Sequence, residues 1–387
     1  MPTNHRPIVT KQPSGKIAEK NANLQVTTPT LLHLMKTTLH LLTLALFLFL
    51  GFACNTPAAE TSTQLLAKGR QPQLAVDAKG ITRIVYGLEE NIYCATSTDN
   101  GQNFTEPELV GTIPGLLLGM SMGPQIASSV NYTLVTAIDK KGNIHSFSLN
   151  HATGKWDKAA GVNDVPQVAA EGLMSIACDK NDTFYALWLD VRHDKQNKIA
   201  LATATGPANT WSANRIIYES PDSTVCECCK PSIVVKGKEV NLMFRNWLNG
   251  SRDFYFTTSA NGGKTFTAPQ KLGYDTWKVE GCPMDGGGLV LDETDSVHTA
   301  WQRDGSIYYA QPGKAEVEVG KGRNCRISGG TNPAITWKDG NNLKLKFLHS
   351  AAIQTIGEGS YIETIEMPDK RTLCVWEDDK ELYFKRI

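Results

Sequence analysis

Short apolar segments alternate with polar turns along residues 69–387, and no stretch after residue 65 has the apolar spacing typical of a helix. Each unit begins with a small residue or proline and a short apolar strand. A turn, often with glycine and a charge, leads to a second apolar strand. The units open at Gln71–Leu74, Gly123–Ile126, Leu173–Ile176, Lys230–Ile233, Cys282–Met284 and Asn332–Ile335. A repeat of about fifty residues predicts a propeller. We therefore expect an all-β fold, a six-bladed β-propeller of four-stranded antiparallel blades, over residues 69–387.

The last unit, residues 330–387, is longer than the others. Two interpretations remain open. The unit contains an irregular insertion around residues 350–366, or its terminal strand completes a blade with the N-terminal end of the domain.

An apolar stretch at residues 41–53 ends at Cys54. It is too short to cross a bilayer as a helix, but it suits the core of a signal peptide. Met35 offers a second start, which makes residues 1–34 an over-extended beginning. Small residues before the cysteine and polar residues after it resemble a bacterial lipobox, although Phe52 is bulkier than usual. The alternative is a cleaved secretory signal with a chance cysteine.

The lipobox resemblance predicts a leader and lipoprotein signal over residues 1–54 and a tether over residues 55–68. The protein would be extracytoplasmic, at the periplasmic or outer surface of a bacterial membrane, and would contact that membrane only through lipid on Cys54. Basic and acidic residues are equal at 39 each, so nothing indicates a nucleic-acid partner. We expect a monomer.

Two segments share a sharper signature, Ser-x-[Asp/Asn]-x-Gly-x-[Thr/Asn]-Phe, at residues 97–104 and 259–266. Such a turn uses an Asp or Asn side chain to bond its own backbone and a glycine to adopt a positive φ. The motif resembles the Asp-box (BNR) repeat of sialidases. The resemblance covers roughly residues 66–387 and implies a sialidase-like propeller, but it concerns the fold more than the activity.

The sialidase resemblance also implies a binding site for an anionic sugar. Arg70 matches the first arginine of the family's carboxylate-binding triad, Arg245 is placed like the second, and Arg303 is a candidate for the third. Tyr361 is the candidate nucleophile, with Glu358 and Glu363 nearby. Guanidinium groups bind planar anions through two hydrogen bonds, which suits a carboxylate or a sulfate.

The chain departs from the family where proton transfer is expected. The second unit carries no acidic residue at the general-acid position, and Cys229 stands where the family has a glutamate, with Glu227 nearby. Mapping the repeat onto a propeller mouth adds further candidates. The catalytic candidates are thus Tyr361, Glu227 and Asp190, and the ligand-binding candidates are Arg70, Arg245, Arg252, Arg303, Trp277 and Asp285.

Four cysteines should meet at the mouth, because Cys226, Cys228 and Cys229 open the fourth unit and Cys282 opens the fifth. Disulfides are the ordinary explanation in an exported protein. A metal site is the second, since four sulfurs suit Cu or Zn, and a redox thiol is the third. Strand alternation would turn Cys226 and Cys228 to one face and Cys229 to the other. The cluster, with Trp277 five residues before Cys282, resembles that of uncharacterised sialidase-like lipoproteins.

The sequence therefore predicts a propeller that binds an anionic carbohydrate, and it leaves open whether the propeller also hydrolyses that carbohydrate as an exo-sialidase-like glycoside hydrolase. Two alternatives stay open. One is a non-catalytic propeller that binds a glycan or a protein, and the other is a metal or thiol site at the cysteines. No cofactor is firmly implied, with Cu or Zn at the cysteine cluster as the candidates.

Overall fold

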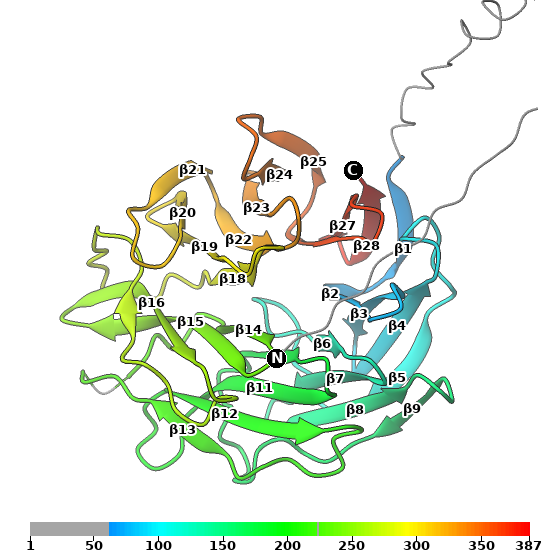
Figure 1. The fold of residues 1–387 in the computed structure, drawn as a ribbon, viewed down its shortest axis with the longest axis horizontal. Coiled ribbons are helices and arrows are strands. Elements are labelled where there is room, and N and C mark those ends of the chain that lie inside the picture. Colours follow the sequence, from blue (N-terminus) through cyan, green and yellow to red (C-terminus); the bar gives the residue numbers. More distant parts are fainter. Residues whose placement is uncertain (1–61, 223) are drawn as a thin grey trace, which may run out of the picture. The chain divides into compact units, whose positions relative to one another are not determined.

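The computed structural model describes residues 62–222 and 224–387. Cys54 and the predicted leader lie outside these residues. The described residues form seven four-stranded antiparallel sheets, which Figure 1 shows arranged as the blades of a ring. Within this part of the chain, no helix is long and apolar enough to cross a membrane.

Each of the first six blades is built from four consecutive strands. Blade 1 contains β2 (Arg70–Val76), β3 (Thr82–Leu88), β4 (Asn91–Ser97) and β5 (Glu108–Thr112). Blade 2 contains β6 (Gln125–Ser128), β7 (Tyr132–Ile138), β8 (Ile144–Asn150) and β9 (Lys155–Lys158). Blade 3 contains β10 (Met174–Cys178), β11 (Thr183–Asp190), β12 (Lys198–Thr205) and β13 (Arg215–Tyr218). Blade 4 contains β14 (Ser232–Lys236), β15 (Glu239–Leu248), β16 (Ser251–Ser259) and β17 (Gln270–Lys271). Blade 5 contains β18 (Gly287–Leu291), β19 (Val297–Arg303), β20 (Ser306–Ala310) and β21 (Val317–Lys321). Blade 6 contains β22 (Arg323–Ser328), β23 (Ala334–Asp339), β24 (Asn342–Phe347) and β25 (Gln354–Glu358).

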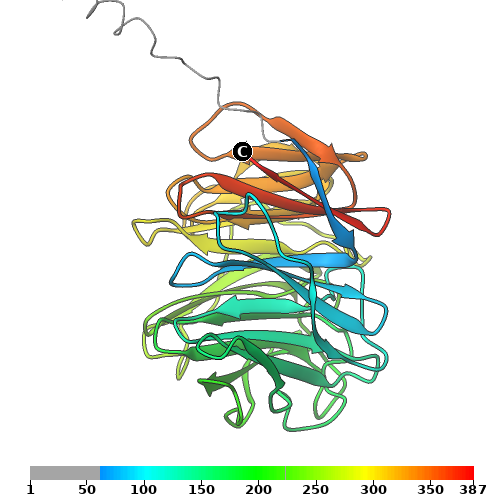
Figure 2. The ribbon, with the colours of Figure 1, turned by 90° about the vertical axis from the view of Figure 1, so that its right-hand side faces the viewer.

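Blade 7 joins the two ends of the domain. It contains β26 (Tyr361–Glu366), β27 (Thr372–Asp378), β28 (Glu381–Arg386) and β1 (Gln64–Lys68). The first strand, β1, pairs antiparallel with β28, from Gln64 opposite Phe384 to Lys68 opposite Glu381. Figure 2 shows the same neighbours from the side, with the blue N-terminal strand beside the red C-terminal strands. The pairing confirms that a terminal strand completes a blade.

The all-β propeller of four-stranded blades is confirmed, but the predicted number of six blades is wrong. The opening at Asn332–Ile335 marks β23, the second strand of blade 6, whose first strand, β22, precedes it. Blade 7 contributes only three strands near the C-terminus, and its fourth comes from residues 64–68. These five residues are therefore part of the propeller and not of the predicted tether. A local repeat misses such a blade because its strands are far apart in the sequence.

The hydrophobic core lies between neighbouring blades. One cluster joins Leu134 of blade 2 with Trp188 of blade 3, and another joins Trp337 of blade 6 with Ile307 of blade 5. The outermost strand must come close to the aromatic residue of the next blade. At Gly320 a Cβ atom would lie 2.7 Å from the Trp337 ring, so only glycine fits without displacing the indole. Packing of this kind holds each blade at a fixed angle to the next.

The two Asp-box-like segments are turns between the third and fourth strands of blades 1 and 4. They share one hydrogen-bond pattern. The Gly101 amide donates to Ser97 Oγ over 2.9 Å, and the Gly263 amide donates to Ser259 Oγ over 3.0 Å. The Asp99 carboxylate accepts from the Asn103 amide over 3.0 Å. Both turns are structural devices that close an outer hairpin.

The first strand of every blade contacts the first strands of its two neighbours, so these seven strands surround the central channel. They all begin at the same end of the ring, because consecutive strands within each blade are antiparallel. The loops that enter β6, β10, β14 and β18 are long, whereas those that enter β2, β22 and β26 are short. This end, called the entry mouth below, therefore has high walls on one side only.

Candidate ligand-binding mouth

Two adjoining pockets open at the entry mouth. One has a volume of about 410 Å³ and the other about 280 Å³, and Met120 and Met284 line both. These methionines come from the loops before β6 and β18, and their exposed fractions are 63% and 48%. The larger pocket, called the cationic pocket, lies toward blades 1, 6 and 7. The smaller, called the methionine pocket, lies toward the cysteine cluster.

Three basic side chains and one carboxylate line the cationic pocket, namely those of Arg70, Arg323, Lys338 and Glu377. Glu377 accepts 3.0 Å hydrogen bonds from Arg70 Nε and from the Gln71 amide. Arg70 keeps 38% of its side chain exposed. Within the described residues, the side chains of Arg323 and Lys338 form no ion pair. The pocket therefore carries an excess of positive charge with donors free for an anion.

Tyr361 forms part of the wall of this pocket and is held by a buried network. Its hydroxyl donates to Glu363 Oε1 over 2.8 Å and accepts from Gln73 Nε2 over 2.6 Å. Arg326 Nε donates to the same Glu363 oxygen over 2.8 Å, and its guanidinium lies 5.0 Å from the Tyr361 ring centre. Burial, followed by the nearby Glu363 charge, raises the pKa of Tyr361 well above its usual value. The phenol is therefore neutral at physiological pH.

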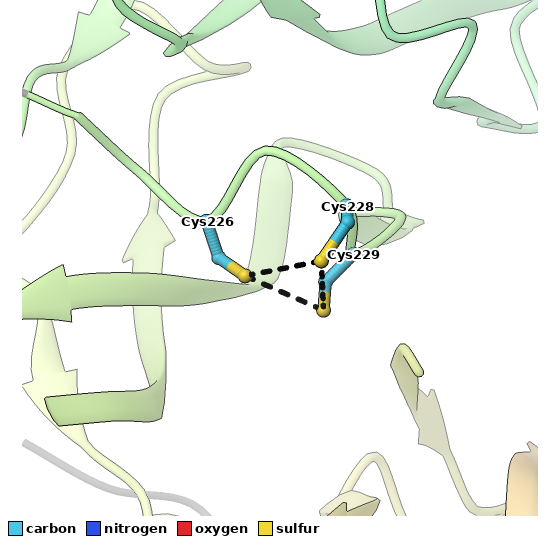
Figure 3. Close-up of side chains that lie close together, drawn as sticks. All are labelled: Cys226, Cys228 and Cys229. Carbon is cyan, nitrogen blue, oxygen red and sulfur yellow. Dashed lines mark hydrogen bonds between the residues drawn. The ribbon is translucent and has the colours of Figure 1, made fainter. Parts of the chain in front are cut away.

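The four mouth cysteines come together as the sequence predicted. A disulfide links Cys228 to Cys282, with their Cα atoms 6.4 Å apart, and so joins the loops before β14 and β18. This bond confirms the disulfide interpretation for two of the four. Figure 3 shows the sulfurs of Cys226, Cys228 and Cys229 gathered at one point. Their separations are 3.7 Å (226–228), 3.6 Å (226–229) and 4.0 Å (228–229).

The expected alternation of these side chains is wrong because residues 226–229 form a turn and not a strand. The turn brings Cys229 to the same side as Cys226 and Cys228. Cys226 and Cys229 are buried free thiols. The Cys229 thiol also donates to the Asp285 carbonyl over 3.1 Å, which ties the turn to the loop before β18.

Arginines surround the cysteine cluster. Arg252 Nη1 donates to Cys226 Sγ over 3.1 Å, and the same guanidinium forms a two-point ion pair with Glu227 at 2.9 and 3.2 Å. The hydrogen bond to Cys229 and the charges of Arg245 and Arg252 lower the pKa of the Cys226 thiol to about 7, although burial opposes this shift. Burial raises the pKa of Cys229 well above its usual value. One thiol of the pair is therefore far more acidic than the other.

The structure does not bring Arg70, Arg245 and Arg303 to one pocket. Arg245 is buried beneath the mouth, where its guanidinium donates to the carbonyls of Arg252, Asp285 and Gln302 over 2.7, 3.1 and 2.7 Å. It also lies 4.2 Å from the Phe254 ring centre. Arg303 pairs with Glu316 at 2.7 Å and with Asp275 at 3.3 Å. Only Arg70 of the three lines the cationic pocket.

The other candidates also have defined partners. Asp190 is fully buried and accepts 2.9 Å hydrogen bonds from Trp188 Nε1 and from the Arg192 amide and guanidinium. Trp277 donates its amide to Asp253, and its ring lies 5.3 Å from the Arg245 guanidinium. Asp285 accepts from the Asn324 amide over 2.8 Å, and burial raises its pKa.

Sequence reasoning did not select Arg323, Lys338, Glu377 or the methionines. Arg323 and Lys338 belong to blade 6, whose first strand the repeat assigned to the preceding unit. Correct assignment of that strand would have placed Arg323 at a strand start, as Arg70 is, with one blade between the two. Met120 lies in a loop outside the repeat pattern, and the repeat included Met284 only as part of the opening at Cys282–Met284.

The fold and this mouth define a seven-bladed β-propeller with a walled, cationic entry. No protein-family model matches the sequence, and no curated protein is similar to it. Solved structures match in fold. A polysaccharide lyase, ulvan lyase, bound to a GlcA(1-4)Rha3S unit aligns with a TM-score of 0.52 at 11% identity, over 84% of this chain and 95% of that chain.

Two further structures have similar folds. A mutant of the lectin of Aleuria aurantia, in complex with Fucα1-6GlcNAc, aligns with a TM-score of 0.50 at 11% identity, over 76% of this chain and 97% of that chain. The Hadza microbial sialidase Hz136 aligns with a TM-score of 0.48 at 12% identity, over 82% of this chain and 65% of that chain. At such identities the similarities to the lyase and the lectin show the propeller fold and nothing finer.

Proposed function

We propose that the entry mouth binds an acidic carbohydrate, with the acidic group of the ligand held in the cationic pocket. The observation that carries the proposal is the arrangement of Arg70, Arg323 and Lys338 around one pocket whose lining carboxylate, Glu377, already bonds Arg70. Charged hydrogen bonds to a carboxylate or a sulfate are strong, and arginine presents them in pairs. The lyase of similar fold is bound to a sugar unit that carries both groups, which is consistent with this ligand class.

Isothermal titration calorimetry tests the proposal. Oligosaccharides that contain glucuronate, sialate or sulfate are expected to bind at least about tenfold more tightly than neutral oligosaccharides of the same length, because each charged hydrogen bond contributes about 1.5–3 kcal/mol. The affinity should weaken as salt increases, since the mouth is open to solvent. Equal affinity for acidic and neutral sugars would contradict the proposal.

We also propose hydrolysis of a sialylated or uronate sugar as the finer form of this function. The Tyr361–Glu363 contact supports it, because a neutral phenol beside a carboxylate base is a nucleophile that an anionic substrate does not repel. Tyr361→Phe is expected to lower turnover of fluorogenic sialosides and uronides by about 10²-fold or more while leaving binding intact. Turnover by Tyr361→Phe at the wild-type rate would exclude this role.

The same proposal includes the location of the protein outside the cytoplasm. Export, lipid attachment at Cys54 and residence at a bacterial membrane would present the entry mouth to glycans outside the cytoplasm. Mass spectrometry of the mature N-terminus tests this part. A chain that retains residues 1–53, or that has an unmodified Cys54, would contradict it.

A second candidate function, metal binding, has a separate observation in its favour. Three sulfur atoms lie within 4.0 Å of one another, which a single ion could bridge. Thiolates suit Cu(I) and Zn, and both elements therefore fit the donor set. The competing role is a redox thiol, for which the acidic Cys226 next to a disulfide is the supporting feature.

A further inference from the structure

The sulfur triangle already has the dimensions of a metal site. An ion bound at about 2.3 Å to each sulfur would hold the sulfurs about 3.8 Å apart in tetrahedral geometry and about 4.0 Å apart in trigonal geometry. The observed separations are 3.7, 3.6 and 4.0 Å. Little movement of Cys226, Cys228 or Cys229 would therefore be needed to bind an ion.

The disulfide controls access to this triangle because Cys228 belongs to both. While Cys228 is bonded to Cys282, its sulfur is not a thiolate. A thiol reductant, oxidised to its disulfide, or a phosphine, oxidised with water to its oxide, would supply two electrons and two protons, which breaks the bond and leaves Cys228 and Cys282 as thiols. Binding of a cation would then release the protons of the coordinating thiols. The reduced cluster thus offers three sulfur ligands, with Cys282 beside them.

Two buried arginines lie beside the cluster and would stabilise a negatively charged metal–thiolate site. Three thiolates and one Cu(I) carry a net charge of minus two. The buried guanidinium of Arg252 donates to Cys226 Sγ over 3.1 Å, and the buried Arg245 contacts the carbonyl of Asp285 to which Cys229 also donates. These two cations would offset part of the negative charge of the thiolates, and Glu227, which pairs with Arg252, adds a further negative charge beside the site.

The approach to the cluster is lined with thioethers. Met120, Met122 and Met284 line the methionine pocket together with Cys228 and Cys282, and Glu171 and Glu227 also line it. The Met284 amide also donates to Cys228 Sγ over 3.4 Å. Met120 and Met284 keep 63% and 48% of their surface exposed beside the cysteine cluster, whereas Met122 packs against a core cluster. Thioether and thiolate sulfurs together favour Cu(I), whereas Mg, Ca and Mn favour oxygen ligands. Among the described residues, no histidine lines this pocket.

We infer that the reduced protein binds one Cu(I) ion through Cys226, Cys228 and Cys229, that the methionine pocket is the route of entry, and that the Cys228–Cys282 disulfide is the metal-free, oxidised form. This inference rests on the proposed metal-binding function. It names Cu(I) as the metal and the Cys228–Cys282 disulfide as the bond that regulates metal binding. It does not depend on carbohydrate binding in the cationic pocket.

The test uses the full-length protein in detergent under anaerobic conditions. One sample is reduced with a phosphine and another is left untreated, and both are titrated with Cu(I) supplied as its acetonitrile complex, and separately with Zn(II). After desalting, the reduced protein is expected to retain one copper per chain and the untreated protein almost none. Competition with a Cu(I) chelator should show an affinity loss of about 100-fold or more in Cys229→Ser. The matched control is Cys94→Ser, which alters a buried free cysteine outside the cluster.

Retention of Zn(II) in place of Cu(I) would overturn the inference while the proposed metal site stands. If the reduced protein retains neither metal, both the Cu(I) inference and the proposed metal site are overturned. If the unreduced protein takes up as much copper as the reduced protein, the disulfide does not control copper binding. If Cys229→Ser does not fold, the double variant Met120→Leu with Met284→Leu tests whether copper enters through the methionine pocket. These exposed substitutions should slow copper uptake and leave Zn(II) binding unchanged, and unchanged copper uptake would overturn the methionine entrance.

Discussion

Replacement of Glu363 with alanine is expected to lower the free energy of unfolding by about 3 kcal/mol. The substitution leaves the Arg326 cation buried without its carboxylate, and it removes the acceptor for the Tyr361 hydroxyl and for Gln73 Nε2. The side chains of Arg326 and Glu363 are only 9% and 15% exposed, so water compensates little. Urea denaturation followed by circular dichroism measures the loss.

The control for this prediction is Glu318→Ala. Glu318 pairs with Lys321 on the surface, where the two side chains are 43% and 70% exposed, and such pairs contribute less than about 1 kcal/mol. Arg326→Met combined with Glu363→Met should destabilise less than the sum of the two single changes, because no charge then remains buried. A loss in Glu363→Ala no larger than in the control would mean that the network does not stabilise the mouth.

Arg70→Gln combined with Arg323→Gln is expected to weaken binding of an acidic oligosaccharide by about 100-fold, since each arginine would lose a charged hydrogen bond of about 1.5 kcal/mol or more. Affinity for neutral sugars should change little. Calorimetric titration of the two proteins with the same oligosaccharide measures the difference, and thermal unfolding checks that the release of Glu377 has not disrupted the blade.

The matched control removes two lysines at the other end of the channel. Lys180 and Lys236 line a pocket of about 590 Å³ formed by the turns that follow the first strands of several blades. Lys180→Gln combined with Lys236→Gln removes the same charge but should leave affinity within about twofold, because exposed charges at this distance are screened. A stronger effect from the lysine pair than from the arginine pair would move the binding site to that end.

The blade architecture could be predicted from sequence because each hairpin is local. Apolar strands, charged turns and two Ser-x-[Asp/Asn]-x-Gly segments all form within a few residues of one another. The number of blades could not, since β1 and β28 pair across the whole domain. Pro333 also precedes a second strand and not a first, so a local repeat placed the boundary of blade 6 incorrectly.

The candidate site was partly predictable for the same reason. Proximity of Cys282 to Cys226–Cys229 follows from adjacent blades, and the disulfide agrees with it. The direction of the Cys229 side chain depends on whether residues 226–229 are a strand or a turn, which the spacing of residues does not determine. Arg245 shows a second limit, because a strand-end arginine can be directed into buried carbonyls as readily as into a ligand pocket.

We propose above all that the cationic pocket binds the acidic group of a carbohydrate. The most direct measurement is a crystal structure of the protein in complex with a glucuronate-containing oligosaccharide. We expect the ligand carboxylate to lie within hydrogen-bonding distance of Arg70 and Arg323, beside Tyr361. An oligosaccharide bound next to Lys180 and Lys236, with only solvent between Arg70 and Arg323, would contradict it.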